Sequence, residues 1–272
     1  MNPPATLDWL QVVFLGLVQG LTEFLPISSS GHLVLASALL QVSEPGIALE
    51  LVLHVGTLIA VVVYYRRDLL RLTQGGFRFV TGDRGIEDRA AVTEIGLLGV
   101  AMVPAVIAAI AFGDYFEAAF ANPRWVCGEL MVNGLLLLST TFAPKGDNRI
   151  GWGRALFIGV MQAWSISPAI SRSGATMAAA LWTGVRPVEA ARFSFLLSIP
   201  AIAGAIAFQG REIAQAWTGA HAGLYSLGAL VSLVSGWFAI EFLLRVIRRG
   251  QFFAFGIYCL VVGAAGWIYF SR

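Results

Sequence analysis

Two apolar stretches of this chain are each interrupted by a cluster of small polar residues, and the two clusters match. In the first, Gln19, Ser28, Ser30 and Gly31 each have an identical counterpart 143 positions later. The counterparts are Gln162, Ser171, Ser173 and Gly174. Because four pairs share one spacing, the pattern indicates an internal duplication. Interrupted apolar helices at equivalent places in two halves of a membrane protein are typical of a binding site near the middle of the bilayer.

The composition indicates a protein that crosses a membrane several times. Hydrophobic residues make up 57% of the 272 residues and charged residues only 12%, whereas about a quarter of the residues of a soluble protein are charged. The mean hydropathy is +0.75. A formal net charge of +2 does not favour a nucleic-acid partner. We therefore expect a single integral membrane domain surrounded by membrane lipids, with repeats at about 7–143 and 150–272.

Six apolar runs are long enough to span, because a bilayer needs about 20 residues. The runs cover about 49–65, 93–112, 125–143, 190–209, 223–244 and 251–270. The stretches 9–40 and 155–185 are different, since each has two short apolar arms around a polar turn. The backbone of such a turn cannot face lipid, because its N–H and C=O groups would be unpaired. The sequence thus predicts an all-α polytopic membrane protein with six transmembrane helices and two re-entrant helical hairpins.

Basic residues indicate how the chain is oriented. Fourteen of the 18 Lys and Arg residues lie in four segments that six crossings place on one side of the membrane. These segments are 66–92, 144–154, 186–192 and 245–250. Cytoplasmic loops are enriched in Lys and Arg, so we expect this side to face the cytoplasm. Three crossings separate the two hairpins, an odd number, so the repeats have inverted topology and the hairpin tips can meet inside the membrane.

Three ionisable residues lie at or beside the predicted tips. Glu23, His32 and Arg172 are at membrane depth, where an unpaired charge costs about 2.5 kcal/mol or more, so each needs a partner. A guanidinium can grip a phosphate with two hydrogen bonds, and hydroxyls can satisfy further phosphate oxygens. We therefore expect an anion site at the two tips. Its hydroxyls are those of Ser28, Ser29, Ser30, Ser171, Ser173 and Thr176.

A carboxylate beside a phosphate site repels the ligand unless it holds a cation or serves as a base. We expect Glu23 to bind a divalent cation, Mg²⁺ with Ca²⁺ as the second option, since Mg²⁺ prefers one or two carboxylates together with substrate phosphates. Gln19 lies one helical turn earlier, and we expect it to touch the ligand or brace the hairpin. His32 can serve as acid, base or nucleophile, and a serine such as Ser29 is the other candidate nucleophile.

Structural roles compete with these functional ones. Serine and glycine in membrane helices commonly allow close packing, and a buried Glu and Arg can simply pair with each other. The coincidence of two equivalent breaks with complementary charges favours function. By the same comparison, we expect His54 to make an interhelical hydrogen bond. We expect Glu129 and Asn133, which share a helix face, to join helices.

Two segments of the chain resemble the signature motifs of the bacterial undecaprenyl-pyrophosphate phosphatase family. Residues 19–32 read QGLTEFLPISSSGH, and residues 168–176 read PAISRSGAT. The resemblance extends to 53–57, 104–105 and 193–197, and so covers nearly the whole chain. It implies an integral inner-membrane enzyme that removes the terminal phosphate from the pyrophosphate of the C55 lipid carrier. Such an enzyme recycles the carrier for peptidoglycan synthesis and confers resistance to bacitracin.

Residue by residue, the resemblance assigns roles at both breaks. The family's E/Q-x-x-x-E motif falls on Gln19 and Glu23, and its catalytic histidine on His32. Its PGxSRSxxT motif falls on Pro168, Ser171, Arg172, Ser173 and Thr176. Two positions depart from the pattern: Gln19, where many members have Glu, and Ala169, where the motif has Gly. The resemblance further implies that the site opens to the periplasm, and it is compatible with a homodimer.

Two other functions fit parts of the pattern. Inverted repeats with broken helices are also the architecture of alternating-access transporters, and such a protein would flip a polyprenyl phosphate without hydrolysing anything. A second family of membrane lipid phosphatases also uses SGH and SR elements, but it requires a histidine shortly after the SR. The next histidine after Arg172 is His221. We therefore expect hydrolysis, which the release of inorganic phosphate from purified protein distinguishes from transport alone.

Overall fold

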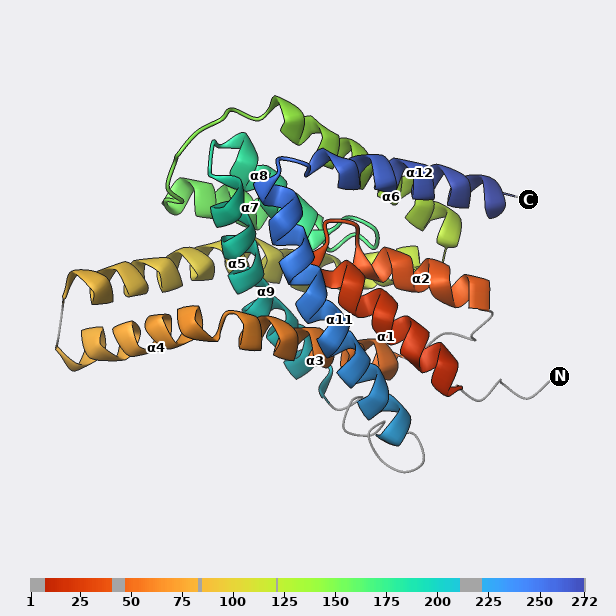
Figure 1. Cartoon of the computed structure of the whole chain (residues 1–272), viewed down its shortest axis with the longest axis horizontal. Coiled ribbons are helices and arrows are strands. Elements are labelled where there is room, and N and C mark those ends of the chain that lie inside the picture. The colour runs from red at the N-terminus through yellow and green to blue at the C-terminus, as the bar shows by residue number, and fades with distance from the viewer. Residues whose placement is uncertain (1–7, 41–46, 83–84, 121, 211–221, 272) are drawn as a thin grey trace.

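The computed structural model describes residues 8–40, 47–82, 85–120, 122–210 and 222–271. Over these ranges the chain is built from α-helices joined by turns (Figure 1). The predicted outer ends of the two repeats, at about residues 7 and 272, lie outside the described ranges. The helices are α1 Trp9–Phe24, α2 Ser29–Leu40, α3 Ile47–Tyr64, α4 Arg66–Thr81, α5 Ile86–Phe120, α6 Pro123–Ser139, α7 Trp152–Trp164, α8 Arg172–Trp182, α9 Pro187–Phe208, α11 Ala222–Arg248 and α12 Phe253–Tyr269, with a 3-10 helix, η1, at Thr140–Phe142.

Both predicted hairpins are present as two short helices around a break. The first consists of α1 and α2, of 16 and 12 residues, around 25–28. The second consists of α7 and α8, of 13 and 11 residues, around 165–171. Each arm is shorter than the roughly 20 residues that cross a bilayer. This length is what a re-entrant segment requires.

All six predicted spans coincide with helices. Four of these helices are long and apolar enough to cross a membrane by themselves, namely α5 over Ile86–Phe112, α6 with η1, α9 and α11. A fifth, α3, passes the same criterion only together with α4, from which it is bent by 73°. The sixth, α12, is apolar but has 17 residues. The chain is therefore a multi-pass helical membrane protein, while the full count of six crossings stays a prediction.

The segment 66–92, which the hydropathy pattern treats as a loop, is largely helical. It contains α4 and the first turns of α5, which lie side by side and project from the rest of the molecule (Figure 1). Ion pairs hold this extension, with Arg71 2.5 Å from Glu94 and Arg78 3.0 Å from Asp88. An apolar-run criterion does not detect α4, because this helix is amphipathic and pairs with α5 through charges.

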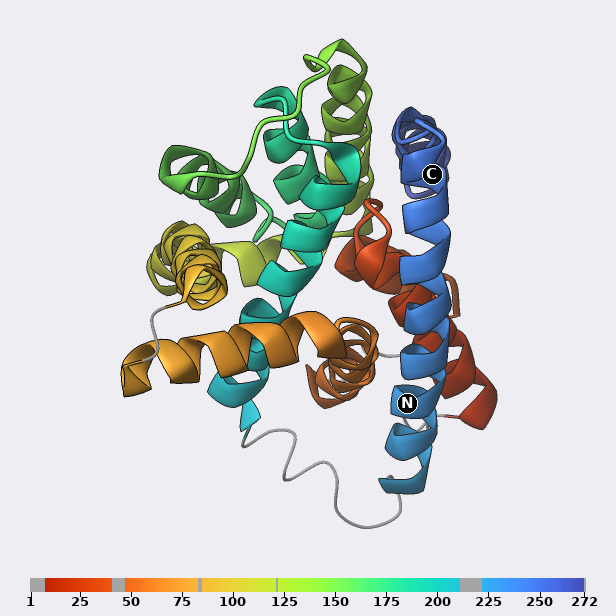
Figure 2. The ribbon, with the colours of Figure 1, turned by 60° about the vertical axis from the view of Figure 1, so that its left-hand side comes forward.

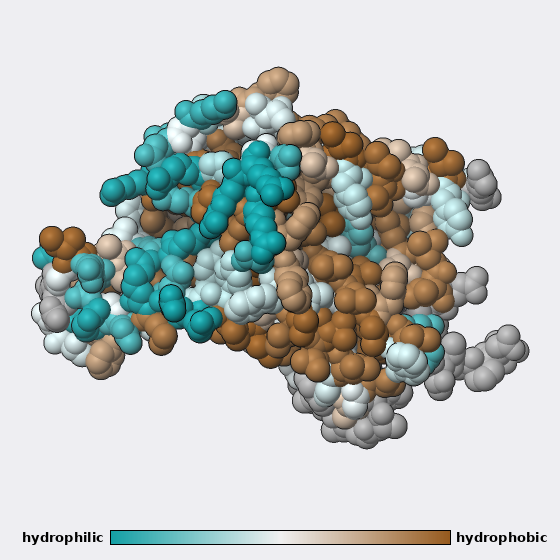
Figure 3. All heavy atoms as spheres, viewed as in Figure 1, coloured by the Kyte–Doolittle hydropathy of each residue, from teal (hydrophilic) through white to brown (hydrophobic). Residues whose placement is uncertain are grey.

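Hydrophilic and hydrophobic side chains cover different parts of the surface. In Figure 3, hydrophilic side chains gather over the region of α4 and the C-terminal part of α11, while a broad hydrophobic surface extends over α1 and the rest of α11. Arg245 and Arg248 lie in the last turn of α11, among these hydrophilic groups. Such a division is expected when one surface faces lipid and another faces water.

Equivalent helices of the two halves make equivalent contacts. α1 packs along α11 (Figure 2), and α7 packs along α5. The contacts are close: a Cβ at Gly16 would lie 2.9 Å from the carbonyl oxygen of Gly228, and a Cβ at Gly159 would lie 2.5 Å from that of Ala101. Gly159 follows Gly16 by the repeat spacing of 143. Glycine at both places lets two backbones approach.

A buried aromatic core supports the first break. Phe24, the last residue of α1, is fully buried and meets Phe195 of α9 edge to face, with ring centroids 5.6 Å apart. Ile27, inside the break, belongs to the same cluster together with Leu137 and Met177. The polar turn is therefore fixed by apolar residues on both sides of it.

We expect Gly159→Ala to lower the thermal stability of the purified protein in detergent. The new methyl group would meet the Ala101 carbonyl at 2.5 Å, and overpacking of this kind costs about 1–3 kcal/mol. Gly99→Ala is the matched control, because nothing lies within 4 Å of a Cβ at Gly99 in α5. Equal melting temperatures for the two variants would contradict the close contact of α7 with α5.

Candidate active site between the two helix breaks

The two breaks lie against each other and exchange hydrogen bonds. Ser30 Oγ donates to the carbonyl oxygen of Pro168 at 2.8 Å, and Ser173 Oγ donates to the carbonyl oxygen of Leu25 at 3.2 Å. Ser173 follows Ser30, and Pro168 follows Leu25, by the same 143 positions. The prediction that the two tips meet is confirmed, and the contact between them is reciprocal.

A serine caps the helix that follows each break. Ser28 Oγ accepts from the amide of Gly31 at 3.2 Å, and Ser171 Oγ accepts from the amide of Gly174 at 3.1 Å. Serine is a preferred capping residue because its oxygen satisfies an amide that the helix leaves unpaired. The two caps differ in one respect, since Ser28 has φ +68°. That left-handed conformation is unusual for a residue other than glycine and is a feature of functional sites.

An ion pair between Glu23 and Arg172 joins the two repeats at the centre of this contact. Glu23 Oε1 lies 2.5 Å from Arg172 Nη2. The other oxygen of Glu23 accepts from Gln19 Nε2 at 3.0 Å and from Ser29 Oγ at 2.6 Å. His54 Nε2 lies 3.6 Å from the same oxygen. Glu23 is buried, with 8% of its surface exposed, so its negative charge is compensated by protein groups rather than by water.

Two buried polar atoms beside this ion pair have no hydrogen-bond partner among the described residues. They are Nη1 of Arg172 and Oε1 of Gln19. A buried donor without an acceptor costs about 1–3 kcal/mol, and more when it is charged. Arg172 therefore keeps a donor for an anionic oxygen, and Gln19 keeps an oxygen for a cation or a donor.

His32 lies at the start of α2 with both ring nitrogens engaged. Nδ1 is 2.8 Å from the carbonyl oxygen of Ser28, and Nε2 is 2.9 Å from the hydroxyl of Tyr258 on α12. The two rings stack at 5.6 Å between centroids with 11° between their planes. His32 is thus held at the first break by groups other than Glu23 and Arg172.

Residues 12–265, which include both breaks, match the protein family described as bacitracin resistance protein BacA. The chain belongs to the BacA family.

Relatives of the chain agree with this membership. It is 40% identical over 267 residues to an undecaprenyl-diphosphatase of Rubrobacter xylanophilus, 39% over 263 residues to one of Alcanivorax borkumensis, and 38% over 273 residues to one of Desulfatibacillum aliphaticivorans. Each match covers 95% of this chain and 97% or 98% of the relative. The similarity therefore extends over both repeats and not only over the motifs.

Most hydroxyls predicted to bind a substrate in this BacA-family chain are occupied by bonds within the protein. Ser28 Oγ donates to Pro168 O at 3.1 Å, in addition to the cap described above. Ser171 and Ser173 share a bond of 3.0 Å between their hydroxyls. Thr176 Oγ1 donates to the carbonyl oxygen of Arg172 at 2.7 Å. These residues are all at the site, where they hold the frame around the ion pair.

Asn133 and Glu129 of α6 contribute more than the predicted link between helices. Asn133 donates from Nδ2 to the carbonyl oxygen of Pro26 at 3.0 Å and accepts from the amide of Ser171 at 3.1 Å. Glu129 accepts from the amide of Ala169 at 2.9 Å and from the hydroxyl of Ser167. One face of α6 thus binds the backbone of both breaks. The signal in the sequence was the spacing of four that places these two residues on one face.

His54 and Tyr258 are site residues to which sequence reasoning gave little or no weight. His54 Nδ1 lies 2.8 Å from the carbonyl oxygen of Glu50 in its own helix, so the predicted contact between helices is made by Nε2. Its other nitrogen points toward Glu23, as given above. Tyr258 lies in an apolar run 226 positions after His32. No local motif indicates that contact, because only the packing of α12 creates it.

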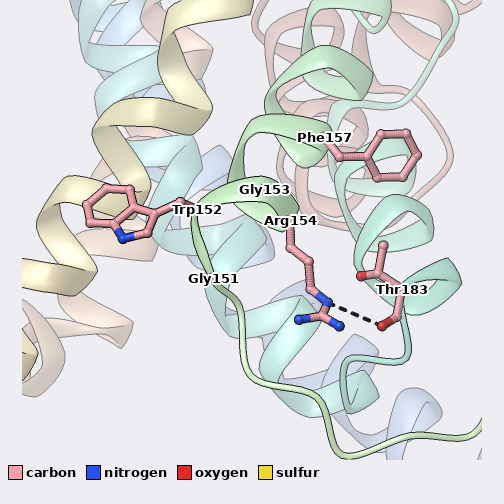
Figure 4. A pocket seen from close by; sticks show the side chains of 6 residues that line it. All are labelled: Gly151, Trp152, Gly153, Arg154, Phe157 and Thr183. Atoms are coloured by element: carbon pink, nitrogen blue, oxygen red, sulfur yellow. Dashed lines mark hydrogen bonds between the residues drawn. The ribbon is translucent and has the colours of Figure 1, made fainter.

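A surface pocket of about 540 Å³ lies away from the ion pair, at the start of α7 (Figure 4). Trp152, Arg154, Phe157 and Thr183 contribute to its lining. The Arg154 side chain is held in it by the carbonyl oxygen of Thr183, at 3.4 Å. The pocket contains none of the residues that the family motifs indicate, so it is not the candidate site.

We expect Asn133→Leu to lower both the melting temperature and the activity of the purified protein. The substitution leaves the Pro26 carbonyl and the Ser171 amide without a partner, at about 1–3 kcal/mol for each buried group. Val132→Leu, on the exposed face of the same helix, should change neither quantity. An Asn133→Leu protein as stable as wild type would show that the breaks do not depend on α6.

Proposed function

We propose that this chain hydrolyses undecaprenyl pyrophosphate to undecaprenyl phosphate and inorganic phosphate. The observation that carries the proposal is the buried, unpartnered Nη1 of Arg172 beside the Glu23–Arg172 ion pair, where the two re-entrant hairpins meet. A guanidinium with a free nitrogen suits one oxygen of a pyrophosphate. We infer the identity of the substrate from the relatives, which are named undecaprenyl-diphosphatase. The product would return to cell-wall synthesis as a lipid carrier.

The residues of the first break can supply the nucleophile and its base. Ser29 Oγ donates to Glu23 at 2.6 Å, which is the distance expected between a nucleophile and the base that activates it. Attack by Ser29 on the terminal phosphorus would release undecaprenyl phosphate and pass the serine proton to Glu23. Water would then hydrolyse the phosphoserine and release inorganic phosphate, with His32 taking a proton from that water and Glu23 returning its proton to Ser29. Arg172 stabilises the charge on the phosphoryl oxygens throughout.

A divalent cation, Mg²⁺ with Ca²⁺ as the second option, is the cofactor that the donor set fits. Glu23 and the free Oε1 of Gln19 are the atoms that would hold it. One carboxylate with substrate phosphates is a usual arrangement for Mg²⁺. Among the described residues no three His, Cys, Asp or Glu side chains form a cluster, so the substrate itself would complete the coordination. When bound, the ion would offset the negative charge of the pyrophosphate.

The placement in the cell is part of the same proposal. An enzyme of this kind belongs in the bacterial inner membrane, with the basic segments facing the cytoplasm and the site opening to the periplasm. The hydrophobic surface in Figure 3 suits contact with lipid, and the polyprenyl tail of the substrate would extend along it. A homodimer stays a prediction.

We expect Arg172→Gln to lower the rate of phosphate release from undecaprenyl pyrophosphate by about 100-fold or more, because removal of one charge-stabilising donor from an active site has effects of this size. Arg172→Lys should remain strongly impaired, since an ammonium keeps the charge but not the two-pronged grip. Arg245→Gln is the control, because Arg245 forms an exposed pair with Glu241. Wild-type protein that binds the lipid but releases no phosphate would favour the flippase alternative instead.

We expect a chelator to abolish phosphate release and Mg²⁺ or Ca²⁺ to restore it. Gln19→Glu should lower the Mg²⁺ concentration needed for half of the maximal rate by roughly tenfold, because a second carboxylate strengthens an oxygen site for Mg²⁺. Gln162→Glu, at the equivalent place in the second repeat, should leave that concentration unchanged. Full activity of the wild-type protein in chelator would refute the cation while leaving the anion role of Arg172 intact.

A further inference from the structure

The hydrogen bond from His32 to Ser28 determines which ring nitrogen carries the proton. A carbonyl oxygen can only accept, so Nδ1, at 2.8 Å from the Ser28 oxygen, must be the protonated nitrogen. In the neutral ring Nε2 then has a free electron pair. Tyr258 lies 2.9 Å from this Nε2, and its hydroxyl therefore donates to it.

Tyr258 also restricts the orientation of the imidazole. The rings are nearly parallel, with 11° between their planes and 5.6 Å between centroids. Tyr258 is 42% exposed, whereas His32 is partly buried. The ring of His32 is thus held at both nitrogens and by its stacking against Tyr258.

We propose that Tyr258 is a positioning residue for His32, an assignment that rests on the proposed hydrolysis. In the resting protein its hydroxyl keeps Nε2 unprotonated and correctly aimed. The attacking water takes the place of the Tyr258 hydroxyl at Nε2. As its oxygen bonds to phosphorus, an O–H bond of the water breaks and the proton goes to Nε2, while the bond from phosphorus to Ser29 Oγ breaks and Glu23 returns its proton to Ser29. The hydroxyl of Tyr258 then rotates and accepts from the new Nε2–H. The same side chain serves both protonation states, because a phenol is donor and acceptor, and it gains or loses no proton itself.

Tyr258→Phe separates this role from a merely structural one. The phenylalanine keeps the stacked ring and removes only the hydroxyl. We expect kcat for phosphate release to fall about tenfold, the size of one hydrogen bond, with KM within about threefold of wild type. Tyr269→Phe is the matched control, since Tyr269 lies on the same helix and packs against Phe270. It should leave both constants unchanged.

A double-mutant cycle tests whether Tyr258 acts through His32. In a His32→Gln background, Tyr258→Phe should cause no further loss, because the group that it positions is gone. An undiminished tenfold loss in that background would overturn the assignment, and so would a Tyr258→Phe enzyme with wild-type kcat. If the wild-type protein releases no phosphate, the proposed hydrolysis is wrong, and the measurement that follows still tests the contact.

The wild-type protein offers a readout that does not depend on any variant's activity. The chain has three histidines, so a ¹⁵N-histidine spectrum of the full-length protein in detergent is simple, and His32→Gln assigns the signal. We expect the His32 ring to carry its proton on Nδ1 at pH 8, and we expect Tyr258→Phe to shift the Nε2 resonance while Tyr269→Phe does not. A proton on Nε2, or an Nε2 signal indifferent to Tyr258, would overturn the assignment.

Discussion

The ion pair between Glu23 and Arg172 is the interaction on which the rest of the site depends. Removing two charges from water costs several kcal/mol for each ion, and their attraction offsets this only if further hydrogen bonds satisfy the remaining atoms. Glu23 meets that condition, because Gln19 and Ser29 donate to it. Arg172 does not, since its Nη1 has no partner in the described part of the chain. The proposed anion would supply the hydrogen-bond acceptor that Nη1 of Arg172 lacks.

The frame around the ion pair solves the problem that any broken helix has inside a membrane. Backbone groups in the breaks need partners, and lipid supplies none. Side chains of the opposite break and of α6 supply them, through Ser30, Ser173 and Asn133. The same bonds fix the charged groups before any ligand arrives, and preorganised charges stabilise a transition state better than charges that must reorient. One set of hydrogen bonds thus pairs the backbone groups of the breaks inside the membrane and also keeps the site rigid.

Much of this could be predicted from the sequence, for identifiable reasons. The repeated spacing of 143 residues and the short apolar arms suffice to place both hairpins. The contact of Glu23 with Arg172 follows because a charged group at membrane depth needs a partner of opposite charge. The helix α4 could not be predicted in this way, because it is held by charge pairs such as that of Arg78 with Asp88. The contact of Tyr258 with His32 could not be predicted either, because the two residues are 226 positions apart and no sequence pattern links them.

Divergence of the two repeats explains why this contact carries a single Glu–Arg pair. The frame is symmetric, as the matched serine caps and reciprocal bonds show, but the charged residues are not. The position equivalent to Glu23 in the second repeat is Ile166, and the position equivalent to Arg172 in the first is Ser29. The second copy of the contact would therefore pair an isoleucine with a serine. Because Glu23 comes from the first half and Arg172 from the second, neither half can form the ion pair alone.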